Sequence, residues 1–86
     1  MDYYVILARS VTYAQRMQTA LERAGIRSRI FRAPRDISNL GCAYAVQVGK
    51  SQLYPALSEL RRVSLEPVQI FSYENGQYRE VEHDLL

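Results

Sequence analysis

The spacing of apolar residues along the chain is typical of strands in some segments and of helices in others. Residues 3–8 (Tyr-Tyr-Val-Ile-Leu-Ala) are uniformly apolar and rich in aromatic and β-branched side chains, which predicts a buried strand. From residue 11 to residue 24 apolar side chains recur every three or four positions, which predicts an amphipathic helix. Ser10 or Thr12 can cap its start, and Gly25 can end it.

The same patterns predict a second helix and four further strands. The second helix has leucines at helical spacing behind a cap at Ser51, and Pro55 is tolerated in its first turn, where most backbone N–H groups lack a helical partner. The pair Asn75-Gly76 favours a type I′ turn between the last two strands. We predict this helix at 52–64 and the strands at 26–32, 42–48, 68–73 and 78–81.

The predicted order is β-α-β-β-α-β with a short C-terminal hairpin strand. Right-handed crossovers then favour an α+β fold, the ferredoxin-like sandwich, with an antiparallel sheet and both helices on one face. The third strand should lie between the first two and should begin at the edge of the sheet where the first strand ends. The length fits one domain over residues 1–86, in which 82–86 form a loose tail.

Composition and charge narrow the function classes. Apolar residues make up 48% and charged residues 23% of the chain, as in globular proteins. No apolar run approaches the roughly 18 residues of a membrane helix, and nothing marks export, so we expect a cytoplasmic protein with no membrane partner. The net charge is only +2, but ten of the eleven basic residues are arginines, whose planar forks bind anions.

The single cysteine, Cys42, is the most distinctive chemical group. One cysteine excludes an internal disulfide and leaves a sulfur metal site without partners, so we expect no metal and no cofactor. Cys42 follows a loop of about nine residues, longer than a hairpin needs. The predicted topology brings it near Arg9, Ser10 and the first turn of the first helix. That helix start and the loop residue Arg35 would both stabilise a thiolate.

The alternative is that Cys42 is an inert core residue. Buried free cysteines commonly act as small hydrophobic residues. Cys42 shares its alternation phase with Tyr44, Val46 and Val48, which fits that interpretation.

The stretch Arg32-Ala-Pro-Arg-Asp-Ile-Ser-Asn-Leu-Gly-Cys42 resembles the central motif of a small bacterial family of selenium/sulfur carrier-like proteins. In that family a Pro-Arg, acidic, hydrophobic, Ser stretch leads to a cysteine and then a strand. The opening Tyr-Tyr-Val-Ile-Leu and the helix ending in Ala-Gly-Ile are also similar to it. Ala43 departs from the family's usual glycine, which would narrow access to the sulfur, and Gln47 stands near a common arginine, which removes one anion contact.

The resemblance implies a carrier. Cys42 would accept sulfur or selenium as a persulfide or perselenide and pass it to a partner protein, with Arg35 supporting the thiolate. Arg9, Ser10, Arg32 and Gly41 are the further candidate contact residues, and Gly41 would permit an unusual backbone angle before the thiol. Whether the protein is an enzyme stays open.

The rival interpretation is a protein-docking or regulatory module that uses the uncovered sheet face. Such a face would carry Tyr3 or Tyr4, Phe31, Tyr44 and Phe71, and could also form a homodimer. RNA-binding domains stack bases on the same face, and Arg27 and Arg29 would add charge there. The low net charge makes nucleic acid an unlikely partner.

Overall fold

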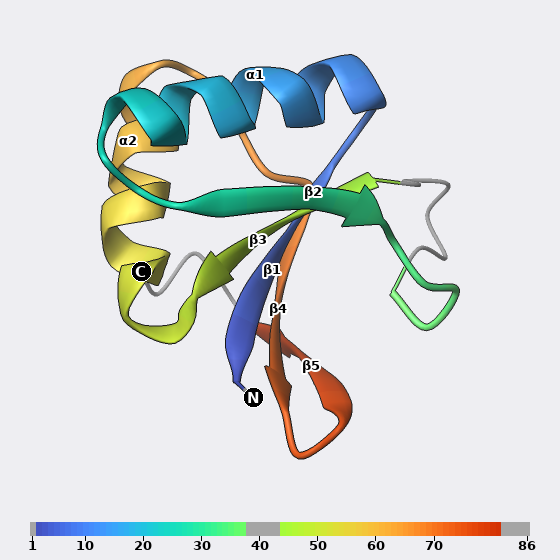
Figure 1. Cartoon of the computed structure of the whole chain (residues 1–86). Coiled ribbons are helices and arrows are strands. Elements are labelled where there is room, and N and C mark those ends of the chain that lie inside the picture. The colour runs from blue at the N-terminus through green and yellow to red at the C-terminus, as the bar shows by residue number, and fades with distance from the viewer. Residues whose placement is uncertain (1, 38–43, 82–86) are drawn as a thin grey trace.

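The protein has a mixed α+β fold in two layers, a sheet and a pair of helices (Figure 1). The computed structural model describes residues 2–37 and 44–81. None of its helices is long and apolar enough to cross a membrane in these described residues. The elements are β1 (Tyr3–Ala8), α1 (Val11–Arg23), β2 (Ser28–Arg32), β3 (Tyr44–Gly49), the 3₁₀ helix η1 (Lys50–Gln52), α2 (Leu53–Arg62), β4 (Gln69–Glu74) and β5 (Gln77–Val81).

The sheet has five strands in the order β2-β3-β1-β4-β5, and every neighbouring pair is antiparallel. β3 lies between β1 and β2, as the sequence pattern predicted. β4 flanks β1 on its other side, and β5 extends the sheet beyond the four strands of the β-α-β-β-α-β unit. The turn before β5 confirms the prediction at Asn75-Gly76, because both residues have positive φ, 52° and 75°.

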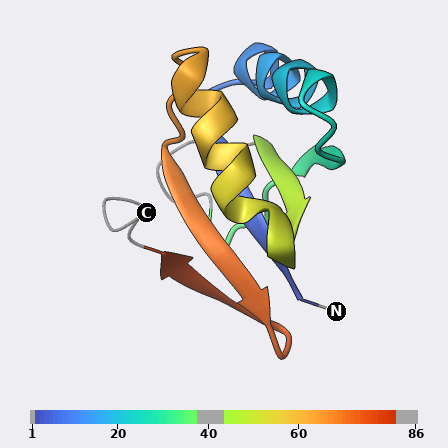
Figure 2. The ribbon, with the colours of Figure 1, turned by 90° about the vertical axis from the view of Figure 1, so that its left-hand side faces the viewer.

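Both helices pack on the same face of the sheet, which confirms that prediction (Figure 2). Alternate residues of the inner strands, such as Ile6, Val46 and Ile70, point to this side and are fully buried. Met17 and Leu21 of α1 close over them, and α2 adds its own apolar stripe. The core therefore lies between the sheet and the helix pair. Four residues form the stripe of α2: Leu53, Ala56, Leu57 and Leu60.

The two ends of α1 follow the predicted signals. The Ser10 hydroxyl oxygen accepts a hydrogen bond of 3.1 Å from the backbone N–H of Tyr13, and Gly25 takes φ +78° just after the helix. The predicted cap at Ser51 is wrong. Ser51 lies inside η1, and α2 begins after Gln52 without a side-chain cap. A residue already in a helical turn cannot adopt the extended backbone that a capping side chain requires.

We expect Ser10→Ala to lower the free energy of unfolding by about 1 kcal/mol, because one N–H at the start of α1 loses its partner. Ser10→Asp should retain most of the stability, since its carboxylate caps equally well and favours the positive helix end. Urea denaturation measures both. Equal losses in the two variants would contradict the capping role.

The sheet face opposite the helices is only partly open, which corrects one prediction. Val5, Leu7 and Ala45 point to this face and are fully buried. Ile37, from the segment after β2, packs against them and is itself 1% exposed. The segment that leads toward Cys42 is therefore anchored on the sheet by one isoleucine.

Two aromatic residues expected on this face lie on the other. Tyr4 and Tyr44 pack against the helix-side core, because they share strand phase with Ile6 and Val46. Aromatic side chains on the face away from the helices include Tyr3, Phe31, Phe71 and Tyr78, which pack at the margin of the Ile37 cluster.

Candidate functional site

Three predicted site residues meet at one end of the sheet, which we call the Arg32 end. Ala8, the last residue of β1, pairs with Tyr44, the first residue of β3, and Tyr44 pairs with Arg32, the last residue of β2. The start of α1 follows directly after β1, so Arg9 and Ser10 lie at this same end (Figure 1). Arg9 and Ser10 therefore lie at the end of the sheet where β3 begins, as the predicted topology requires, and Arg32 lies at the same end.

Arg9 and Ser10 are both engaged in the first turn of α1. The guanidinium carbon of Arg9 lies 4.7 Å from the centre of the Tyr13 ring, a cation–π contact. The Ser10 oxygen is used as the helix cap, and the Tyr13 hydroxyl accepts a 3.2 Å hydrogen bond from the backbone N–H of Glu66. Ser10 therefore has a structural role, whereas the exposed Arg9 is held in place as a cation.

The segment after β2 turns tightly and presents Arg35 to solvent. The backbone N–H of Ile37 donates a 3.1 Å hydrogen bond to the carbonyl of Pro34, which closes a four-residue turn. Arg35 and Asp36 occupy its exposed middle, while Ile37 is buried on the sheet. Gly41 and Cys42, the remaining predicted site residues, lie outside the described residues.

The arginines of this region are not neutralised by ion pairs in the described structure. Within residues 2–37 and 44–81 the two ion pairs are Lys50 with Asp2 and Arg62 with Glu59. Arg9, Arg32 and Arg35 take part in neither, and all three are exposed. Three guanidinium groups are thus available to an anion near this end of the sheet. No group of three or more potential metal-ligating side chains gathers among the same residues.

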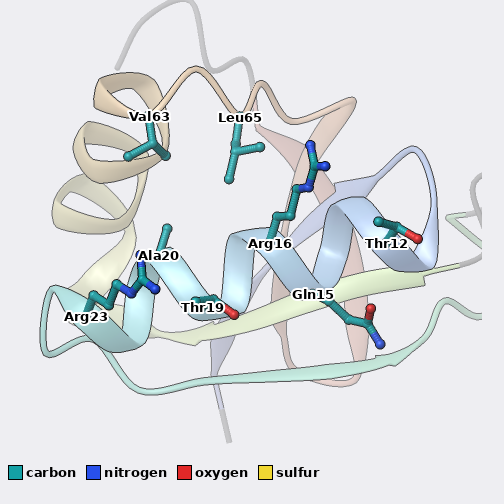
Figure 3. A pocket seen from close by; sticks show the side chains of 8 residues that line it. All are labelled: Thr12, Gln15, Arg16, Thr19, Ala20, Arg23, Val63 and Leu65. Carbon is teal, nitrogen blue, oxygen red and sulfur yellow. The ribbon is translucent and has the colours of Figure 1, made fainter.

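A groove that the sequence did not predict runs along α1, between that helix and the connection from α2 to β4 (Figure 3). It has a volume of about 450 Å³ and an apolar floor formed by Ala20, Val63 and Leu65. Arg16 and Arg23 stand on the helix beside this floor (Figure 3). The α1 residues of the groove look like ordinary helix surface in the sequence, because the groove exists only once residues 63–65 fold over α1.

A row of three tyrosines crosses the opposite end of the sheet, on the face without helices. The rings of Tyr3 and Tyr73 are stacked with centroids 4.8 Å apart, and Tyr73 and Tyr78 are 4.7 Å apart and tilted. Burial, with a contribution from the Tyr3 hydroxyl, raises the pKa of Tyr78 to about 12. Tyr78 is therefore neutral at physiological pH. The sequence pattern leaves Tyr3 and Tyr4 as alternatives for this face and contains no signal for the row of tyrosines.

A comparison with protein families finds one match, to the model described as "Putative Se/S carrier protein-like", over residues 3–72. The matched region contains the Arg32-to-Cys42 motif and every described residue of the Arg32 end. No curated protein and no solved structure matches the chain.

Proposed function

The chain belongs to the Se/S carrier protein-like family, and we propose that it carries a sulfur or selenium atom on the thiol of Cys42. The Cys42 thiolate attacks the outer sulfur of a donor hydropersulfide, whose S–S bond breaks and whose thiolate leaves. Cys42 then holds the atom as a persulfide, and the overall transfer needs no outside oxidant. In the second step a nucleophile on the acceptor protein takes the outer sulfur and Cys42 leaves as thiolate. Selenium would be transferred in the same way, with an S–Se bond broken in the donor and an S–Se bond formed at Cys42.

The convergence at the Arg32 end is the observation that carries this proposal. Cys42 precedes Tyr44 by two residues, which span at most about 7 Å of chain. We therefore expect the thiol close to the strand ends that bear Arg9 and Arg32. Nearby guanidinium groups and a helix N-terminus both favour a thiolate over a thiol. Arg9 and Arg32 are the proposed anion contacts, and Arg35 is the proposed support for the thiolate.

The remaining parts of the proposal concern scaffold and setting. The strand order β4-β1-β3-β2, with both helices on one face, supports a ferredoxin-like scaffold extended by β5. We propose a cytoplasmic carrier whose donor and acceptor are proteins. The homodimer expected from the sequence stays a prediction.

The thiol pKa tests the proposal. In the wild-type protein the rate of alkylation of Cys42 by iodoacetamide, followed against pH, should have a midpoint below the free-thiol value of about 8.5. Arg35→Ala should raise that midpoint, because a positive neighbour is removed. Arg79→Ala, which removes an exposed arginine from β5, is the matched control and should leave the midpoint unchanged. A wild-type midpoint at the free-thiol value, or no alkylation in the folded protein, would refute an activated thiol.

A protein-docking module is the second candidate, and the groove along α1 favours it. Its apolar floor and its two arginines would suit an apolar side chain flanked by carboxylates. A carrier also has to dock its partners, so the groove fits either function. The alkylation experiment separates the two, because a docking module has no need of a low thiol pKa.

A further inference from the structure

A second cavity opens at the end of the sheet opposite the Arg32 end, where β2 begins and β3 ends. Its volume is about 520 Å³, within the range of about 300–1,000 Å³ typical of small-molecule sites. We call it the Gly49 cavity. It is lined by Arg27, Ser28, Arg29, Gln47, Val48, Gly49 and Gln52.

Gly49 leaves space in the tyrosine row of the sheet. It pairs with Tyr3 across β1 and β3, and it shares strand phase with Ala45, on the face without helices. The row across the sheet at this level is therefore Gly49, Tyr3, Tyr73 and Tyr78. A side chain at Gly49 would continue the row, and the one atom near its Cβ position is the Gln52 Cγ, at 3.9 Å. Tyr3, the pairing partner of Gly49, is a neighbour of the cavity and not one of its lining residues.

The stacking on Tyr73 uses only one of the two faces of the Tyr3 ring. Tyr3 and Tyr73 lie on neighbouring strands, and their centroid separation of 4.8 Å matches the strand spacing of about 4.8 Å. The interplanar angle of 19° makes the two rings nearly parallel, so each ring covers one face of the other. The other face of Tyr3 is turned away from Tyr73, to the side of β1 on which β3 and Gly49 lie.

Two arginines that take part in no ion pair of the described residues line the Gly49 cavity. Arg27 and Arg29 are exposed and take part in neither ion pair of the described residues. The carboxylate of Asp2, next to Tyr3 in the chain, pairs with Lys50 at 3.7 Å and not with either arginine. The half-buried Gln47 lies on β3, where it pairs with Arg29 of β2 on one side and with Val5 of β1 on the other.

We propose that the Gly49 cavity binds a nucleotide, free or as one unit of a single strand. The base stacks on the open face of Tyr3 above Gly49, and the Gln47 amide lies within reach of the base edge. The phosphate binds the guanidinium groups of Arg27 and Arg29, which suit it in charge and planar geometry. The site lies at the opposite end of the sheet from the Arg32 end and does not depend on the proposed role of Cys42.

The test measures binding by the full chain of four nucleoside monophosphates, by calorimetry, and of a short fluorescein-labelled oligothymidylate, by anisotropy. Gly49→Leu is the decisive variant. Its backbone, at φ −63° and ψ 158°, accepts any side chain, and an added Cβ would meet only the Gln52 Cγ at 3.9 Å. The leucine should fill the space that Gly49 leaves in the row and weaken binding by about tenfold or more, with the melting temperature unchanged.

Two further variants test the stacking of the base and the binding of the phosphate separately. Tyr3→Phe should retain binding, because the ring still stacks. Arg29→Gln should weaken binding about tenfold, the loss expected for one charged contact, whereas the control Arg79→Gln should not.

The outcomes separate the two sources of nucleotide. Saturable binding of a monophosphate identifies a free nucleotide, and binding of the oligonucleotide alone identifies a single strand. No saturable binding of either probe at millimolar concentration overturns the proposal. Binding by a folded Gly49→Leu protein equal to that of the wild type also overturns it. If Gly49→Leu does not fold, equal binding by Arg29→Gln and the Arg79→Gln control has the same consequence.

Discussion

Replacing Cys42 with serine is expected to abolish the loading of sulfur completely. A serine hydroxyl is not ionised at neutral pH, and residue 42 then has no sulfur atom with which to form an S–S bond. The wild-type protein, incubated with a low-molecular-weight hydropersulfide, should gain the mass of one sulfur atom by intact mass spectrometry. Dithiothreitol should remove it. The serine variant should show neither change.

This experiment has a clean readout because Cys42 is the single cysteine of the chain. No other thiol can mask the loss or produce a false gain. A serine variant that still gains a sulfur atom would place the acceptor elsewhere and refute the carrier proposal. Arg35→Ala is the matched variant, since it should load more slowly at neutral pH yet reach the same final mass.

Ile37→Ala is expected to lower the free energy of unfolding by about 2–5 kcal/mol, the range for truncating a fully buried aliphatic side chain. Ile37 is 1% exposed and packs on Val5, Leu7 and Ala45, on the sheet face that the helices leave free. A domain of this kind has only about 5–15 kcal/mol in total, so the loss is large. Chemical denaturation monitored by circular dichroism measures it.

Two controls make the Ile37 result specific. Ile37→Val should cost about 0.5–1.5 kcal/mol, because most of the buried side chain remains. Val11→Ala, at a position that is 40% exposed on α1, should change stability by about 0.5 kcal/mol or less. A loss for Ile37→Ala as small as that of Val11→Ala would show that the segment after β2 is not docked on the sheet.

The sequence pattern predicted the elements and their order because each carries a clear period or a specific turn signal. Gly25 and Asn75-Gly76 sit at positive φ, a conformation that few other residues adopt at low cost. It was harder to predict which residues of β1 point toward the helices. A strand that is buried on both faces is apolar throughout, so its sequence does not say which of Tyr3 and Tyr4 faces the helices. The antiparallel register with β3 and β4 decides it.

The placement of Arg9 and Ser10 near the start of β3 was predictable, because the topology of the sheet alone determines it. Arg9, Ser10 and Arg32 meet because β1 and β2 end, and β3 begins, at one end of the sheet. Ile37 was not predictable as an anchor, since a single apolar residue among turn formers has no period that shows its direction. The groove along α1 and the Gly49 cavity also escaped prediction, because each joins residues that are distant in sequence and individually ordinary.

The central position of β1 constrains the order in which the chain can fold during synthesis. Its two hydrogen-bonding neighbours come from residues 44–49 and 69–74, so both edges of Tyr3–Ala8 stay unpaired until most of the chain has been made. α1 can form early and shield one face, but it cannot satisfy the backbone of a strand. Such distant pairings slow folding and expose an apolar strand meanwhile. The nascent chain is therefore most vulnerable to aggregation before Glu74 leaves the ribosome, and a chaperone that holds its first strand would protect it most at that stage.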